Sequence, residues 1–137
     1  MPHQLNFSLM HKYDSAKGGI VIPESLIQAE KVIECQARVD TGAEYCLFAR
    51  SYADQLGLDV ESGHEIEMGT LTTPFPAFGH VITLQTLNMA FESMVYFPQS
   101  YEIRRNLLGR NGWLHLIRLG IIAYDEIIYI GLYDDMT

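Results

Sequence analysis

The chain has 137 residues, of which 48% are hydrophobic, and nine Lys and Arg against seventeen Asp and Glu give it a net charge of −8. This length suffices for one globular domain and is too short for two. The acidic balance argues against a nucleic-acid backbone or an anionic membrane surface as the main partner, because both carry negative charge.

The two cysteines, Cys35 and Cys46, are too few for a disulfide-stabilised secreted scaffold or a closed cysteine zinc site. The first twelve residues contain no apolar run long enough for a signal peptide. Nowhere do about eighteen apolar residues follow one another, as a transmembrane helix requires. The composition therefore predicts a soluble, cytoplasmic single domain with no membrane partner.

The first eighteen residues are polar and mixed, and Gly18-Gly19 ends them. We expect residues 1–18 to form an arm or edge extension and residues 19–137 to form the domain. In Val32–Asp40 apolar residues alternate with polar ones, which is typical of a half-buried strand. The β-branched residues of Gly19–Ile22 predict another strand before it, and a hairpin through Ala29-Glu30-Lys31 would join the two.

Two stretches look helical. Ala49–Leu56 ends at Gly57, and Asn111–Arg118 ends near Gly120, each a good C-terminal stop for a helix. Both predicted helices are short, so they add little to a chain dominated by strand patterns.

The segment Gly63–His80 combines an alternating pattern with threonines, prolines and glycines, and it predicts a long hairpin with an exposed tip around Leu71–Phe75. Apolar residues at such a tip, Leu71, Phe75 and Phe78, need a covering surface. A ligand, another chain and the domain itself all remain open as that surface.

The remaining strands follow the same logic. His80–Leu87 and Met89–Phe97 are predicted strands separated by Asn88. Ile121–Leu132 predicts a tight hairpin turning at Tyr124-Asp125-Glu126, in which Ile128, Ile130 and Leu132 share one face. Many short strands with one or two short helices predict an all-β barrel or sandwich.

Asp40-Thr41-Gly42-Ala43 comes directly after the most regular predicted strand. A glycine just past a strand allows a sharp turn and a close approach of a ligand to the backbone. Asp40 would then be displayed where the rigid sheet meets a loop. The tripeptide alone is only suggestive, since short motifs also arise by chance. The alternative is a plain turn in which the Asp40 side chain caps its own backbone.

A second motif, Asn106-Leu107-Leu108-Gly109-Arg110-Asn111, lies about seventy residues downstream, at the start of the second predicted helix. With the Asp-Thr-Gly-Ala turn before it and a hairpin between the two, this order of motifs resembles the retropepsins, the single-domain aspartic proteases of retroviruses and their cellular and bacterial relatives. The resemblance covers roughly Gly19 to Leu132. It implies an all-β, closed acid-protease barrel with Gly63–His80 as a flap hairpin and one or two short helices.

The resemblance also implies a role for each matching residue. Asp40 corresponds to the catalytic aspartate, Thr41 to the threonine that bonds across the dimer axis, and Gly42 to the glycine whose carbonyl meets the substrate backbone. Arg110 matches an arginine that pairs with an acid, here Glu44, and so supports the active-site loop. The alternative is that Arg110 is a surface residue at a helix end. The implied substrate-binding residues are Gly42, Ala43, Glu44, Leu71, Thr72 and Thr73.

Aspartic proteolysis uses two carboxylates that share one proton, and this chain contains one Asp-Thr-Gly sequence. The second carboxylate must therefore come from Asp40 of a second copy, placed opposite the first by a two-fold axis. The expected function is a homodimeric aspartic endopeptidase that hydrolyses a peptide or protein substrate. It needs neither a metal nor an organic cofactor, because the nucleophile is water.

Other functions remain as alternatives. The chain could be a catalytically silent retropepsin-fold module for peptide binding or assembly, or a structural β-barrel in which the motif is only a turn. Cys46 lies near the proposed site, but no paired histidine is evident for a thiol nucleophile. The five histidines show no metal-ligand spacing.

Overall fold

The computed structural model describes residues 1–69 and 73–135, and β-strands dominate them. The strands are β1 (Leu9–Lys12), β2 (Val21–Gln28), β3 (Lys31–Val39), β4 (His64–Met68), β5 (Phe75–Thr86), β6 (Met89–Pro98), β7 (Leu107–Leu108), β8 (Ile117–Ile122) and β9 (Ile127–Leu132). The helical elements are α1 (Arg50–Gln55) and four short 3₁₀ turns, η1 (Ser15–Lys17), η2 (Val60–Ser62), η3 (Leu114–Leu116) and η4 (Ala123–Asp125). No helix in these ranges is long and apolar enough to cross a bilayer.

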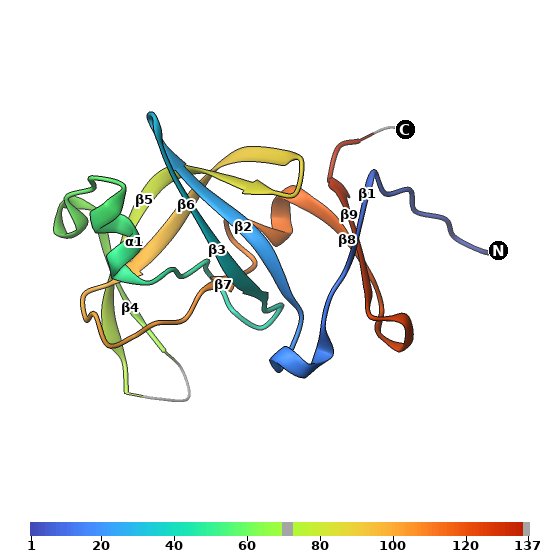
Figure 1. The fold of residues 1–137 in the computed structure, drawn as a ribbon, viewed down its shortest axis with the longest axis horizontal. Coiled ribbons are helices and arrows are strands. Elements are labelled where there is room, and N and C mark those ends of the chain that lie inside the picture. The colour runs from blue at the N-terminus through green and yellow to red at the C-terminus, as the bar shows by residue number, and fades with distance from the viewer. Residues whose placement is uncertain (70–72, 136–137) are drawn as a thin grey trace.

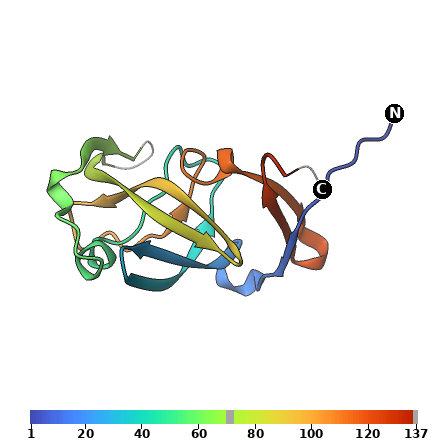
Figure 2. The same ribbon diagram turned by 90° about the horizontal axis from the view of Figure 1, so that it is seen from above.

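The strands form two sheets. The larger has the order β4-β5-β2-β3-β7, with β6 paired to β5, and the smaller has the order β1-β9-β8. Figures 1 and 2 show the smaller sheet at one end of the molecule, beside the N-terminal segment, and α1 toward the other end. Within residues 1–69 and 73–135 the strand pairing does not close into a ring, so the closed barrel expected from the resemblance is not found.

The predicted hairpins are confirmed. β2 and β3 pair from Val21↔Arg38 to Gln28↔Lys31, which leaves Ala29 and Glu30 as the turn. Ala29 adopts the left-handed backbone conformation, with φ of 54°, that tight turns require. β5 and β6 pair along their length up to Thr86↔Met89, and β8 pairs with β9 on either side of η4.

The second predicted helix, Asn111–Arg118, is wrong. Only the single turn η3 forms in this stretch, and the chain then enters strand β8 at Ile117. Gly112 has a φ of 101°, which a right-handed helix does not allow, and Trp113 is fully buried in the core. The β-branched residues at Ile117, Ile121 and Ile122 favour pairing with β9, which explains why a strand forms instead.

The hydrophobic core lies between the strands and is closed by large side chains from the connections. Its largest fully buried members include Trp113, Phe48, Phe97, Ile22, Leu26, Leu84, Leu108, Ile128 and Ile130. The expected shared face of the last hairpin is only partly realised. Ile128 and Ile130 are fully buried, but Leu132, at the strand end, remains 39% exposed.

The first eighteen residues contribute an edge strand. β1 pairs antiparallel with β9, from Leu9↔Ile130 to Lys12↔Ile127, at the rim of the smaller sheet. Tyr13, directly after it, is buried in the main core cluster. The segment therefore supplies an edge strand to the smaller sheet and one side chain to the core.

The segment Gly63–His80 contains the antiparallel pair β4–β5, whose register runs from His64↔Gly79 to Met68↔Phe75. Phe78 is buried in the main core cluster, and Phe75 packs against a smaller cluster around Leu47 and Tyr96. The domain itself therefore covers these two aromatic side chains. Leu71, the third apolar residue of the predicted tip, lies outside the described residues.

Candidate active site

The two sequence motifs meet in space at the end of β3. β3 and the two-residue strand β7 pair in parallel, with Val39 opposite Leu108. The Asp40 backbone N–H donates to the Leu108 carbonyl over 3.0 Å, and the Val39 N–H donates to the Ile20 carbonyl over 2.8 Å. The start of the Asp40 loop is therefore held from both sides by backbone hydrogen bonds.

The Asp40 side chain shapes its own loop. Its Oδ1 accepts a 3.0 Å hydrogen bond from the Gly42 backbone N–H, and the Asp40 carbonyl accepts a 3.2 Å bond from the Ala43 N–H. The capped turn that was one interpretation of this motif is therefore present. Asp40 is half-buried, and Thr41 and Gly42 are exposed. Asp40 also lines a surface pocket of about 490 Å³, a space that a ligand can enter.

The second motif is joined to the first by backbone contacts further along the loop. The Arg110 N–H donates to the Ala43 carbonyl over 2.9 Å, and the Asn111 N–H donates to the Glu44 carbonyl over 2.8 Å. Gly109 is packed so closely here that an added Cβ would overlap the Tyr45 carbonyl group and lie 2.9 Å from the Ala43 carbonyl oxygen. Glycine at position 109 is thus what allows the two segments to approach.

The expected ion pair between Arg110 and Glu44 is not formed among residues 1–69 and 73–135. Both side chains are exposed, and the ion pair found in these ranges joins Arg50 to Glu61 at 2.9 Å. Exposed pairs gain little over hydration, so nothing compels the two side chains to meet. The contact between these residues is instead the backbone bonding of their segments.

Asn106, the first residue of the second motif, anchors the segment before β7. Its Nδ2 donates to the Gln36 carbonyl over 3.0 Å, and its Oδ1 accepts a 3.2 Å bond from the Ala49 N–H. Asn106 therefore ties together β3, the start of α1 and the entrance to β7. Sequence reasoning included Asn106 in the motif but assigned it no role.

Cys46 does not support thiol chemistry. It is fully buried, and burial raises the pKa of its thiol to about 12, although a hydrogen bond from the Gly109 N–H acts in the opposite direction. A thiol with such a pKa is protonated at neutral pH, and the thiolate is the nucleophile. Burial likewise raises the pKa of Cys35 to about 12. Cys35 lies in β3 and Cys46 on the connection between β3 and α1, and both pack as small apolar residues at the main core cluster.

The remaining predicted substrate-binding residues lie apart from the loop in sequence. Thr73 is exposed on the connection between β4 and β5. Leu71 and Thr72, on the same connection, lie outside the described residues. For metals, no group of three His, Cys, Asp or Glu side chains in residues 1–69 and 73–135 is placed to hold an ion.

A second acid, Glu24, is buried in the same sheet and was missed by sequence reasoning. It is 2% exposed, and both its carboxylate oxygens lie within 2.8 Å of the Thr86 hydroxyl, which itself accepts a 2.9 Å bond from Trp113 Nε1. Burial raises the pKa of Glu24 to about 8, against the opposing effect of the Thr86 hydrogen bond. The available signal was its position between Ile22 and Leu26, where the strand period turns it inward.

The fold is similar to solved aspartic proteases. A retropepsin-like aspartic protease from Rickettsia conorii superposes with a TM-score of 0.66 at 14% identity, over 93% of this chain and 97% of that one. EIAV protease complexed with the inhibitor HBY-793 superposes with a TM-score of 0.51 at 13% identity, over 77% of this chain and 88% of that one. No family model and no curated protein matches the sequence. The chain therefore has a retropepsin-like fold.

Proposed function

We propose that this chain is an aspartic endopeptidase that acts as a homodimer. The observation that carries the proposal is the junction of the two motifs: within a retropepsin-like fold, backbone hydrogen bonds join Asp40 to Leu108 and Ala43 to Arg110. Asp40 lines a pocket at this junction. An acid held this way is positioned by the sheet while its surroundings stay open to a substrate.

The chemistry assigned to Asp40 requires a pair of such acids with one proton between them. The ionised carboxylate takes a proton from a bound water, whose oxygen attacks the carbonyl carbon of the scissile amide, while the protonated carboxyl donates to the carbonyl oxygen. Collapse of the tetrahedral intermediate breaks the C–N bond, and the amine nitrogen leaves with a proton. Both carboxyl groups return to their starting states, so no cofactor is consumed.

The second carboxylate is the Asp40 of a partner copy. A two-fold axis through the loop places the same residue opposite itself, which is how one motif per chain supplies two acids. Thr41 and Gly42 are exposed in the single chain, which leaves this part of the loop accessible to a partner. The Gly42 carbonyl then meets the peptide backbone, with Ala43 and Glu44 beside it. The β4–β5 hairpin, with Leu71, Thr72 and Thr73 in its connection, acts as the flap.

A mixing experiment tests activity and assembly together. Wild type should cleave members of a peptide library, a pepstatin-type transition-state mimic should block this, and Asp40→Asn should be inactive but folded. Mixing wild type with an equal amount of Asp40→Asn should lower the activity to about half, because chains exchange into dimers with one acid. An unchanged activity would show that each chain acts alone. Cleavage by purified Asp40→Asn would remove Asp40 from the mechanism.

A further inference from the structure

The pocket beside Asp40 is rich in arginine. Arg38, Arg104 and Arg105 line it together with Asp40, Gln36 and Asn106, and its volume is about 490 Å³. This is within the size range of pockets that take small molecules or side chains. Three of the nine Lys and Arg residues of an otherwise acidic chain therefore surround one cavity.

The topology explains why these side chains converge. Arg38 lies in β3, two residues before Asp40, and both residues line the pocket. The Arg38 N–H donates to the Asn106 carbonyl over 2.9 Å, and Arg38 lies opposite Leu107 in the β3–β7 pair. Arg104 and Arg105, just before Asn106, are thereby brought alongside the end of β3.

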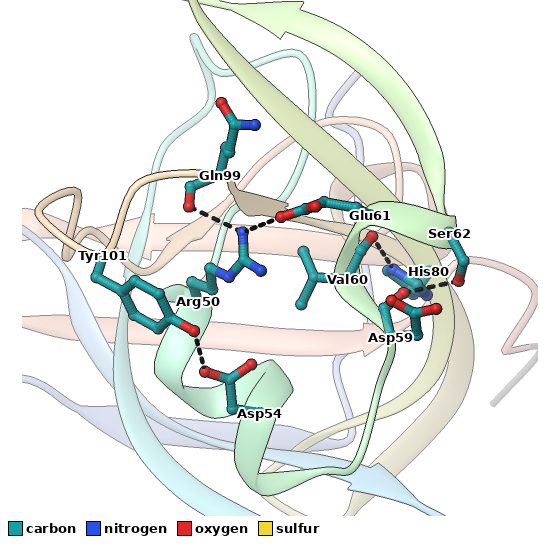
Figure 3. A network of polar contacts seen from close by, with 9 residues as sticks. All are labelled: Arg50, Asp54, Asp59, Val60, Glu61, Ser62, His80, Gln99 and Tyr101. Atoms are coloured by element: carbon teal, nitrogen blue, oxygen red, sulfur yellow. Dashed lines mark hydrogen bonds and ion pairs between the residues drawn. The ribbon is translucent and has the colours of Figure 1, made fainter.

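The three guanidinium groups are available to a ligand. All three side chains are exposed, and within residues 1–69 and 73–135 none of their guanidiniums forms an ion pair or a hydrogen bond to protein. Arg50 shows the contrast (Figure 3): its Nη1 binds Glu61 Oε1 and the Gln99 carbonyl, each at 2.9 Å, and its guanidinium lies over the Tyr101 ring. Arg50 is used within the fold, whereas the pocket arginines are not.

The segment that carries Arg104 and Arg105 is anchored at both ends. Before them, the Tyr101 hydroxyl donates to Asp54 Oδ2 over 2.6 Å (Figure 3), and after them Asn106 bonds to the Gln36 carbonyl. An anchored segment loses less conformational freedom when a ligand binds, so more of the interaction appears as affinity.

We propose that this pocket is a specificity pocket for an acidic side chain, Asp or Glu, next to the scissile bond of the substrate; the inference rests on the proposed protease function. Guanidinium groups bind carboxylates through paired charge-assisted hydrogen bonds, and three of them outweigh the single charge of Asp40. The net charge of −8 disfavours a long polyanion, such as a nucleic acid, at the same place. A single side-chain carboxylate reaches the arginines without that repulsion.

The test compares peptides that differ only by Glu or Gln at each position flanking a cleaved bond. At one position kcat/KM at low salt should be about tenfold higher for the Glu peptide than for the Gln peptide, which is on the order of what a few partly exposed ion pairs provide. This Glu/Gln ratio should fall in 0.5 M NaCl, because salt screens the charges. Arg104→Gln with Arg105→Gln should bring the ratio close to one. Lys12→Gln with Lys31→Gln, which removes the same charge elsewhere, should leave the ratio unchanged.

The outcomes separate this inference from the function on which it rests. Efficient cleavage with no preference for Glu, or a preference that survives the double arginine variant, overturns the acidic pocket but not the protease. If no peptide is cleaved, the pocket is still tested by fluorescence anisotropy, which measures how tightly the Asp40→Asn variant binds the same Glu and Gln peptides. Tighter binding of the Glu peptide supports the pocket, whereas equal binding, or tighter binding of a single-stranded RNA of similar length, overturns it.

Discussion

Glu24 lies in β2 and Asp40 lies just past the end of the adjacent strand β3, and the surroundings of these two acids differ in kind. Glu24 points into the core, where burial raises its pKa to about 8 and the Thr86 hydroxyl is its hydrogen-bonding partner. Asp40 stands just past the end of β3, half-buried, with Oδ1 bonded to the Gly42 N–H. One acid is surrounded by side chains, and the other is held by backbone.

The comparison shows two different ways in which one fold supports a carboxyl group. Trp113 Nε1 donates to Thr86 and the Thr86 hydroxyl donates to Glu24, so this chain of hydrogen bonds runs in one direction and ends on a buried carboxyl. An acid there remains protonated at neutral pH and acts on stability. Backbone hydrogen bonds hold the Asp40 loop without covering the side chain, which leaves Asp40 accessible for chemistry.

The largest expected effect separates the two acids by activity. Asp40→Asn should reduce peptide hydrolysis by at least about a thousandfold, because the amide neither accepts nor donates the transferred proton. Glu24→Gln, the matching change in the core, should retain activity within about threefold as long as the chain stays folded. Both rates are measured as kcat/KM on one peptide. If both variants lost kcat/KM to the same extent, the assignment of catalysis to Asp40 and not to Glu24 would be wrong.

The second expected effect is on stability and involves only Glu24. Its pKa rises from the ordinary value of 4.5 to about 8 on folding. Between these values the folded chain holds a proton that the unfolded chain has released, so the free energy of unfolding falls as pH rises, by about 1.4 kcal/mol per unit. This amounts to about 4 kcal/mol between pH 5 and 8, and the loss is complete above the folded pKa.

Urea unfolding of wild type and Glu24→Gln at several pH values between 5 and 9 measures this effect. The variant carries no titrating group at position 24, so its stability should decline less steeply across the window. The difference between the two slopes is informative even if the amide itself lowers stability. Parallel curves would show that Glu24 is already ionised in the folded chain.

The third expected effect tests the close approach that supports the Asp40 loop. Gly109→Ala should lower the free energy of unfolding by about 3 kcal/mol, because the new methyl group overlaps the Tyr45 carbonyl and backbone must move. Gly131→Ala is the matched control, since an added Cβ there meets its nearest atom at 3.5 Å, an ordinary contact. Thermal unfolding compares the two, and equal midpoints would show that the loop yields without strain.

The smallest expected effect concerns Arg110. Its side chain is exposed, and in the described part of the chain it forms no ion pair with Glu44, so Arg110→Ala should change stability by less than about 0.5 kcal/mol. The backbone bond from the Arg110 N–H to Ala43 is unaffected by this change. A loss of about 2 kcal/mol in urea unfolding would instead indicate that the guanidinium has a buried partner in the assembled protein.

Much of the fold could be predicted from local patterns. The alternation in Val32–Asp40 identified β3, and Gly57 marked the end of α1 within two residues. These features depend on neighbours in sequence, where strand period and glycine stops act. The second predicted helix was wrong because the stop signal near Gly120 was given more weight than the β-branched residues of β8, and the left-handed conformation of Gly112 is not visible in sequence.

The candidate site was predictable only in part. Asp40 and Leu108 could be brought together through the resemblance to retropepsins, since the parallel pair β3–β7 joins residues far apart in sequence. The arginine pocket could not be predicted from the sequence, because Arg104 and Arg105 lie near Arg38 only through the pairing of β3 with β7. The strand period could have predicted that Glu24 faces inward. Its hydrogen-bonding partner Thr86 could not be predicted in this way, because Thr86 comes from another strand.

The parallel pair β3–β7 also sets when the site is assembled during synthesis. About seventy residues separate Asp40 from its partner Leu108. A ribosome adding about 5 to 20 residues per second needs roughly 4 to 14 seconds to bridge that gap. β1 waits longer still, because its partner β9 follows it by more sequence than separates β3 from β7. Nascent chains therefore spend these seconds with the Asp40 loop lacking its partner strand β7.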